Sequence, residues 1–346
     1  MRSFVLILFG ILVLGGVFFF ASPFGKKVSQ TAQKTATDMV DPVQNSAYKT
    51  LTIPYLRSLT YTSKLGEREQ YEQSQVYTSY LTSYTSNGLK INGLLTIPTG
   101  QMPKIGWPAI VFIHGYIPPS QYSTTERYVD YVDYLARNGF VVFKIDLRGH
   151  GESEGKAGGA YFSSDYVIDT LNAYAALANA NFVDRKAIGL WGHSMAGNIV
   201  MRSLAVRPEI SAAVIWAGAG YSYSDLFTYR IQDPSYQQGP NFTNQSSLRS
   251  RLLKEFGDPT KGGAFWKEVA PTNYFSDFKG AIEIHHAEDD DVVNIGYSRD
   301  LTALLDKTKI PHEFYTYPSG GHNLTEPSFS LAMQRTVEFY KKYLNN

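Results

Sequence analysis

The chain of 346 residues contains no cysteine. This absence excludes disulfide bonds, a cysteine nucleophile, thiolate-bound metals and a lipid-modified N-terminal cysteine. Charge is also sparse and balanced, because 32 Lys and Arg residues stand against 31 Asp and Glu residues. With a formal net charge of +1, the chain has no basic excess for nucleic acid, so we expect no nucleic-acid partner.

The sequence also lacks internal repeats, so a solenoid or another repeat architecture is excluded. Its length and its hydrophobic fraction of 43% are enough for one large α/β domain, or at most two domains. Tyr and Phe are plentiful, with 25 and 20 residues. Aromatic side chains often line apolar binding clefts, although most of these will be core residues.

One long apolar run, residues 4–21, lies at the amino terminus and has basic residues on both sides. It is near the lower limit for a membrane span and longer than the usual apolar region of a signal peptide. Three phenylalanines at 18–20 occupy the place where a cleavage site needs small residues. We therefore predict a transmembrane signal-anchor over 1–24, with a cleaved signal peptide as the alternative. Because signal-like segments usually direct the downstream chain across the membrane, we expect the rest of the chain outside the cytoplasm.

Residues 25–74 are predicted to form a linker and lead-in to one domain over 75–346. The part from Ser29 to about Thr52 is rich in Ser, Thr, Gln and Lys and has few large apolar residues. Such a composition is typical of a solvated tether.

From residue 75 onward, strand and helix patterns alternate. An antiparallel pair is predicted at 75–84 and 89–97, joined at the turn signal Asn87-Gly88. A capping-box pattern at 123–126 predicts the start of a helix that Asn138-Gly139 ends. The further predicted strands are 108–113, 140–145, 187–191, 212–216, 281–286 and 312–317, and the further predicted helices are 165–181, 196–206, 295–306 and 327–344.

This alternation is typical of an α/β fold with a mostly parallel central sheet and helices on both faces. Ligands of such sheets bind at the carboxyl ends of the strands. Residues 219–279 interrupt the alternation and are long, aromatic and polar. We expect this segment to form a small cap insertion over the site.

Ser194 stands in a turn of small residues between a predicted strand and a predicted helix. Such a strained turn holds a serine hydroxyl at the end of a sheet as a nucleophile. The usual pattern has glycine two residues before and after the serine; here Gly192 keeps the first position and Ala196 replaces the second. The alternative is a serine that only caps a helix in a glycine-rich turn.

A serine nucleophile needs a histidine as base and a carboxylate that orients the histidine. On this architecture the chain order is serine, acid, histidine, each beyond the end of a strand. Asp290 follows the strand 281–286, and His322 follows the strand 312–317. Both the order and the positions match, so we predict Ser194, Asp290 and His322 as the catalytic residues.

Two neighbouring acids, Asp289 and Asp291, are rivals of Asp290. The acidic run could instead hold a hard cation or form a solvated loop. A second cluster of oxygen ligands is not evident in the sequence, so we expect no metal and no cofactor. For the oxyanion we predict the backbone N–H groups of Met195, after the nucleophile, and Tyr116, in an early loop after a strand.

The other chemistry-bearing residues near strand ends have structural interpretations. His285 and His286 lie at a strand end, where a hydrogen-bonded structural histidine is the commoner case, and His312 opens a strand. His114 is expected to make a structural hydrogen bond in its loop. Three further residues are interpreted as loop scaffolding, with a substrate role as the alternative: Asp146, Arg148 and His150.

Together these motifs resemble the α/β-hydrolase superfamily, over roughly residues 75–344. Within it they look most like the catalytic domain of prolyl-oligopeptidase-type serine peptidases, which include dipeptidyl and acylaminoacyl peptidases. The resemblance implies the α/β-hydrolase fold and a serine-type peptidase. The motifs that carry it are His114-Gly115-Tyr116, Asp146 to Ser153, Gly192 to Gly197, Asp290 with Val293, and Gly321-His322.

The sequence departs from that family at Ala196, and it has no room for the amino-terminal β-propeller that gates access in those peptidases. The alternative is therefore a carboxylesterase that acts on small esters. A further alternative is a non-catalytic binding protein on a hydrolase fold. The expected partners are a small peptide or ester substrate and, through residues 1–24, a membrane; the sequence predicts no oligomeric state.

Overall fold

The computed structural model describes residues 43, 46–229, 231–232 and 240–344. The chain divides into two compact units, Met1–Ser46 and Ala47–Asn346, and the elements below belong to the second unit. The expected membrane anchor at 1–24 lies outside the described residues. Within the described ranges, no helix is long and apolar enough to cross a membrane.

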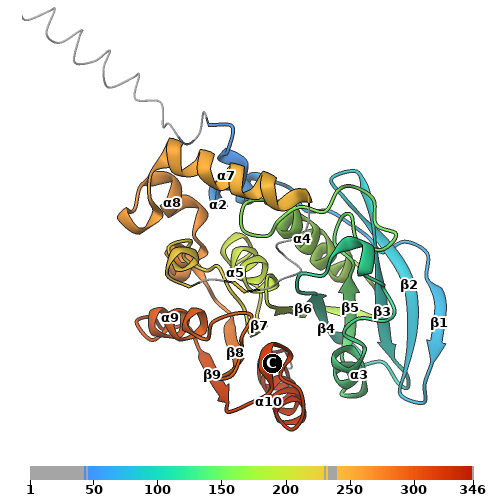
Figure 1. Cartoon of the computed structure of the whole chain (residues 1–346). Coiled ribbons are helices and arrows are strands. Elements are labelled where there is room, and N and C mark those ends of the chain that lie inside the picture. Colours follow the sequence, from blue (N-terminus) through green and yellow to red (C-terminus); the bar gives the residue numbers. More distant parts are fainter. Residues whose placement is uncertain (1–42, 44–45, 230, 233–239, 345–346) are drawn as a thin grey trace, which may run out of the picture. The chain divides into compact units, whose positions relative to one another are not determined.

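The described part of the chain forms one central sheet of nine strands in the order β1-β2-β3-β5-β4-β6-β7-β8-β9 (Figure 1). The strands β1 to β3 are antiparallel to their neighbours, and β5, β4, β6, β7, β8 and β9 run parallel. The expectation of a mostly parallel sheet is confirmed. The bounds are β1 Glu69–Gln73, β2 Tyr77–Ser86, β3 Leu89–Pro98, β4 Trp107–Ile113, β5 Val141–Ile145, β6 Val183–His193, β7 Ala212–Trp216, β8 Ala281–Ala287 and β9 His312–Tyr317.

The hairpin of β2 and β3 forms where the turn signal predicts it. Asn87 and Gly88 both have positive φ angles, +49° and +79°, as a two-residue turn with matching twist requires. The strand β1 was not predicted, because all five of its residues are exposed and mostly polar. Its pairing with β2 is made by the backbone, so its side chains carry no hydrophobic pattern.

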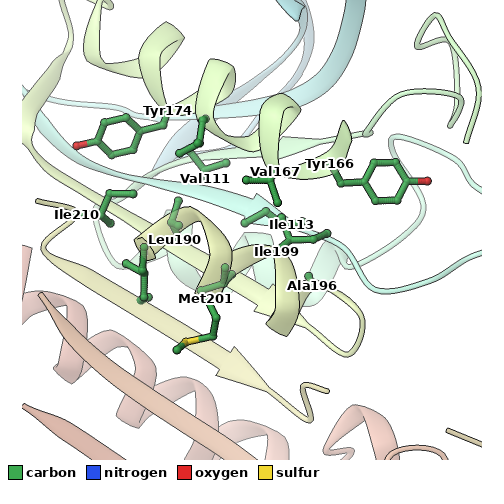
Figure 2. Packing of buried hydrophobic residues seen from close by; sticks show 14 of the residues in the cluster. Val111, Ile113, Tyr166, Val167, Tyr174, Leu190, Ala196, Ile199, Met201 and Ile210 are labelled. Carbon is green, nitrogen blue, oxygen red and sulfur yellow. The ribbon is translucent and has the colours of Figure 1, made fainter. Parts of the chain in front are cut away.

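Helices cover both faces of the sheet (Figure 1). One buried cluster joins the sheet to α4, α5 and α9, and the other joins it to α3 and α10. Figure 2 shows the first cluster, in which Val167 and Ile199 pack near Val111, Ile113 and Leu190. The α-helices are α2 Ile53–Ser58, α3 Val129–Arg137, α4 Asp165–Ala178, α5 Ala196–Val206, α6 Asp225–Thr228, α7 Pro240–Phe256, α8 Ala264–Val269, α9 Gly296–Leu305 and α10 Ser328–Leu344, and the 3₁₀ helices are η1 Lys49–Leu51, η2 Pro119–Gln121, η4 Pro259–Lys261, η5 Pro271–Asp277 and η6 Gly321–Asn323.

The predicted start of α3 was wrong. The helix begins at Val129 after Tyr128, which is left-handed with φ +59° and makes no side-chain cap. Thr124, inside the apparent capping box, donates its hydroxyl to Asp146 at 2.6 Å. This tertiary hydrogen bond ties the segment to the loop after β5, and the helix begins only at Val129. The end of the helix at Asn138 agrees with the prediction.

The expected lead-in contains residues that fold with the domain. The second unit begins at Ala47 rather than at residue 75. Its first α-helix, α2, is capped by Thr52, whose hydroxyl accepts from the Tyr55 amide at 3.2 Å. Ile53 and Leu56 are fully buried, and α2 packs against α5.

Residues 219–279 contain helices rather than strands, apart from the gaps in description at 230 and 233–239; they are the 17-residue α7 and the shorter α6, α8, η4 and η5. The described contacts place η5 against α5 and α8 against α2. That this segment caps the site stays a prediction, because none of its described residues is among those that line the pocket around Ser194.

Candidate active site

Ser194 occupies a sharp turn between β6 and α5. Its φ angle is +56°, in the left-handed region that residues other than glycine rarely adopt. The turn is held by backbone bonds, because the Ser194 amide donates to the Trp216 carbonyl and the Gly197 amide donates to the Ser194 carbonyl, both at 2.9 Å. A residue held in such a conformation is typical of functional sites.

Small residues are needed around this turn because neighbouring backbones approach closely. A Cβ on Gly192 would lie 2.7 Å from Val200 Cγ2, and one on Gly197 would lie 2.8 Å from the Gly218 Cα. The Ala196 side chain is fully buried beside them. Alanine is therefore accommodated at the second position of the pattern, whereas Gly192 and Gly197 have no space for a Cβ.

Asp290 and His322 lie within hydrogen-bond distance. His322 Nδ1 is 2.8 Å from Asp290 Oδ2, so an Nδ1–H donates to the carboxylate. The other oxygen, Oδ1, accepts from the Val292 and Val293 amides at 2.9 Å each. His286 Nε2 lies 3.1 Å from Oδ2. The side chain of Asp290 is thus fully buried but well supplied with donors.

These contacts determine the charge of Asp290. Burial alone would raise its pKa, but the hydrogen bonds from His286, His322 and the Val293 amide outweigh burial and hold the pKa well below its usual range. The carboxylate is therefore ionised at neutral pH. An ionised carboxylate at Nδ1 fixes the tautomer of His322, leaving Nε2 free of a proton and able to accept one.

The two rival acids have other positions. Asp289 Oδ1 accepts from the Gly321 amide at 2.8 Å, so it holds the backbone of the His322 loop rather than the ring. Asp291 is exposed to solvent. Among the described residues, Asp290 is the carboxylate that bonds the His322 ring.

The remaining histidines have buried or local partners. His286 Nδ1 lies 2.7 Å from the Ser298 hydroxyl, so this histidine links Asp290 to α9. His285 contacts Glu283 at 2.7 Å, and His312 contacts Asp306 at 3.0 Å. His114 lies between the carbonyls of Gly115 and Asp146, and burial lowers its pKa to about 3.

The charged residues after β5 hold loops together. Asp146 accepts hydroxyl hydrogen bonds from Tyr122 and Thr124, at 2.8 and 2.6 Å. Arg148 forms a buried ion pair with Asp169 at 2.7 Å. His150 Nε2 lies 3.2 Å from the Ile117 carbonyl. Neither Asp146 nor Arg148 nor His150 is among the residues that line the pocket around Ser194.

A cavity of about 410 Å³ brings several predicted site residues together. It is lined by Ser194, His322 and Tyr116. Met195, the next residue after Ser194, is the N-cap of α5, and the first amides of a helix have no intrahelical acceptor. The described residues that line it are Gly115, Tyr116, Ile117, Arg127, Tyr128, Tyr131, His193, Ser194, His322 and Asn323. A larger cavity of about 1100 Å³ lies by β1, β2 and β3 and contains none of the predicted site residues.

Sequence reasoning missed part of this lining. Arg127, Tyr128 and Tyr131 precede or begin α3, and in the sequence they carry only a helix pattern. His193 had a stronger signal, since it is adjacent to the nucleophile. Among the described residues, no cluster of three or more His, Asp or Glu side chains forms a candidate metal site.

Comparisons with known proteins agree with this architecture. The model of a family described as serine aminopeptidase, S33, matches residues 108–242. An uncharacterized peptidase, YtmA, of Bacillus subtilis (strain 168) is 24% identical over 72% of this chain and 88% of its own length. Dipeptidyl aminopeptidase BIII of Pseudoxanthomonas mexicana is 23% identical over 75% of this chain, which spans only 35% of that protein.

Solved structures show the same fold. Acetyl xylan esterase 1 from Thermoanaerobacterium sp. JW/SL YS485 is similar over 83% of this chain and 91% of its own, with a TM-score of 0.58 and 19% identity. Relatives named as peptidases and as esterases therefore share this architecture. The motifs, the fold and these comparisons show that the chain has the α/β-hydrolase fold and resembles the catalytic domain of prolyl-oligopeptidase-type serine peptidases.

Proposed function

We propose that this protein is a serine hydrolase that cleaves an ester or amide through an acyl-enzyme on Ser194. The observation that carries the proposal is the pairing of His322 with the buried, ionised Asp290 in a site whose pocket also contains Ser194. In this mechanism His322 Nε2 takes the Ser194 proton as the hydroxyl attacks the substrate carbonyl.

The later steps use the same groups. The backbone amides of Met195 and Tyr116 stabilise the oxyanion, and His322 returns the proton to the leaving group. A water molecule, deprotonated by His322, then attacks the acyl-enzyme and releases the acid. Asp290 stabilises the imidazolium form of His322 in both halves of the reaction without taking its proton.

For the substrate we favour a small peptide, cleaved by a serine-type peptidase of the prolyl-oligopeptidase type. The likeness to the Bacillus peptidase supports this choice because it extends over 88% of that protein's length. A carboxylesterase for small esters is the second candidate, supported by the likeness to acetyl xylan esterase 1 over 91% of that chain.

Turnover of matched substrates separates these two candidates. Activated esters are easily cleaved, so hydrolysis of p-nitrophenyl butyrate alone does not identify a peptidase. We expect the purified protein also to cleave aminoacyl and dipeptidyl p-nitroanilides, and Ser194→Ala to cleave neither class. Turnover of the ester without turnover of the anilides would favour the esterase. If Ser194→Ala kept both activities, the proposed nucleophile would be contradicted.

We further propose that residues 1–24 attach the protein to a membrane with the hydrolase domain outside the cytoplasm. The support is the length and composition of the apolar run in the sequence. The full chain should remain in the membrane fraction after alkaline carbonate extraction, and external protease should reach its domain in intact cells. Extraction of the uncleaved chain by carbonate would contradict the anchor.

A further inference from the structure

A chain of three hydrogen bonds connects residues that line the pocket around Ser194. The Gly115 amide lies 2.9 Å from the Tyr128 hydroxyl oxygen, and that oxygen lies 2.7 Å from His193 Nδ1. At the other side of the ring, His193 Nε2 lies 2.8 Å from the backbone carbonyl oxygen of His322. The chain therefore joins the loop before Tyr116, the residue before Ser194 and the loop of the proposed base.

The two ends of this chain fix its direction. The Gly115 amide can only donate, so the Tyr128 oxygen accepts from it. The His322 carbonyl can only accept, so His193 Nε2 carries the proton and donates. In a neutral ring Nδ1 is then an acceptor, and it receives the Tyr128 O–H. Every donor has an acceptor in this one arrangement.

Burial keeps the arrangement in this form. His193 is 2% exposed, and burial together with the neighbouring His322 lowers its pKa to about 3, so the ring is neutral near pH 7. Its centroid lies 4.6 Å from that of the His322 ring. Tyr128 packs edge-on against Phe112, with ring centroids 5.5 Å apart.

The backbone at both ends of the Tyr128–Gly115 bond is also unusual. Tyr128 adopts a left-handed backbone conformation with φ +59°, which is rare for residues other than glycine. A Cβ on Gly115 would lie 2.8 Å from the Tyr128 hydroxyl, 3.1 Å from His193 Nδ1 and 3.2 Å from Ser194 Cβ. These groups converge on the one residue that precedes the proposed oxyanion donor.

We propose that Tyr128 and His193 are positioning residues that hold the oxyanion loop and the His322 loop in register with Ser194. This inference rests on the proposed function, because it assigns the Tyr116 amide and His322 their parts in the reaction. Neither Tyr128 nor His193 exchanges a proton with the substrate. They act through the backbone of Gly115 and His322, and thereby favour the transition state more than the bound substrate.

The test is Tyr128→Phe, which keeps the ring but removes the hydroxyl shared by Gly115 and His193. We expect kcat to fall about 10- to 100-fold with little change in KM, since a displaced oxyanion donor affects mainly the transition state. The inhibition constant of an alkyl trifluoromethyl ketone, whose tetrahedral adduct carries the oxyanion, should rise by a similar factor. Tyr134→Phe, in the helix α3 that follows Tyr128 but outside the pocket lining, is the matched control and should behave as wild type.

A double-mutant cycle with His193→Ala shows whether the two residues act as one chain. The double variant should lose no more activity than the more damaged single variant, because either change interrupts the same connection. Wild-type kcat and inhibitor affinity in Tyr128→Phe, or additive losses in the cycle, would overturn the inference. If Tyr128→Phe does not fold, an unchanged kcat and inhibitor affinity in His193→Ala would overturn it equally.

Failure of the proposed function would be distinct from these outcomes. If wild-type protein does not react with a fluorophosphonate at Ser194, the serine hydrolase mechanism itself fails. If wild type reacts and turns over substrate while Tyr128→Phe matches it in both kcat and inhibitor affinity, only the positioning role fails.

Discussion

Asp290 Oδ2 lies 2.8 Å from His322 Nδ1, although the two residues are 32 positions apart in the chain. Two separate loops, after β8 and β9, bring them together at one edge of the parallel sheet. Because the other carboxylate oxygen is held by two backbone amides, the orientation of Asp290 is fixed before any substrate binds.

Replacing this carboxylate by an amide should remove most of the activity. We expect Asp290→Asn to lower kcat by roughly 10³- to 10⁴-fold, because the amide no longer fixes the tautomer of His322 or stabilises its imidazolium form. Asp291→Asn is the control and should stay near wild type, since Asp291 is exposed. Hydrolysis of a chromogenic ester measures both. Full activity in Asp290→Asn would contradict the assignment of the acid.

The same residue should make stability depend on pH. Its pKa is lower in the folded chain than the ordinary value of 3.8, so the unfolded state binds more protons in the acidic range. The contribution is complete above the unfolded pKa and is lost as pH falls toward the folded pKa. Relative to Asp290→Asn, wild type should lose about 2 kcal/mol of unfolding free energy between pH 6 and roughly pH 2. Urea unfolding at several pH values tests this, and parallel pH profiles would contradict it.

Backbone crowding around Ser194 predicts that substitutions at two adjacent positions differ in their effects on stability and activity. Gly197→Ala should destabilise the protein by about 1–3 kcal/mol and impair activity, because its Cβ would meet the Gly218 backbone at 2.8 Å. Ala196→Gly, which restores the familiar pattern, should keep activity and cost about 1 kcal/mol or less. Thermal unfolding and ester hydrolysis measure the two variants. Equal effects would show that the crowding at Gly197 is relieved by relaxation.

Arg127 should select for negatively charged substrates. It lines the pocket of Ser194, no carboxylate residue is among the described lining residues, and no described residue forms an ion pair with it. We expect Arg127→Gln to lower kcat/KM for mono-p-nitrophenyl succinate about threefold to fivefold, and less at high salt. Hydrolysis of neutral p-nitrophenyl butyrate should change little, and Arg127→Lys should retain most of the preference. An unchanged ratio between the two esters in Arg127→Gln would exclude this role.

Much of the fold could be predicted because its strands carry continuous apolar runs. The strands β5, β7 and β8 are buried along their whole length, and their predicted bounds agree with the structure to within one residue. The exposed strand β1 and the short helix α2 could not be predicted in this way. One has no apolar face, and the other buries only Ile53 and Leu56 from within a polar stretch.

The candidate site was predictable where it follows from topology. Ser194, Asp290 and His322 each follow a strand of one parallel sheet, so their shared edge could be inferred from chain order. The Tyr128–His193 chain could not be inferred, because its contacts join residues 65 and 129 positions apart through a left-handed tyrosine. The start of α3 was mispredicted for a related reason, since Thr124 ties the segment with the apparent capping box to Asp146, which is distant in the sequence.

The central claim is that Ser194 is an activated nucleophile. Labelling with a fluorophosphonate probe tests it most directly, because the probe reacts with activated serines in folded hydrolases and does not require the natural substrate. We predict that wild type is labelled at Ser194, identified by peptide mass spectrometry, and that Ser194→Ala is not labelled. Labelling that survives Ser194→Ala, or folded wild-type protein that is not labelled at all, would contradict the account.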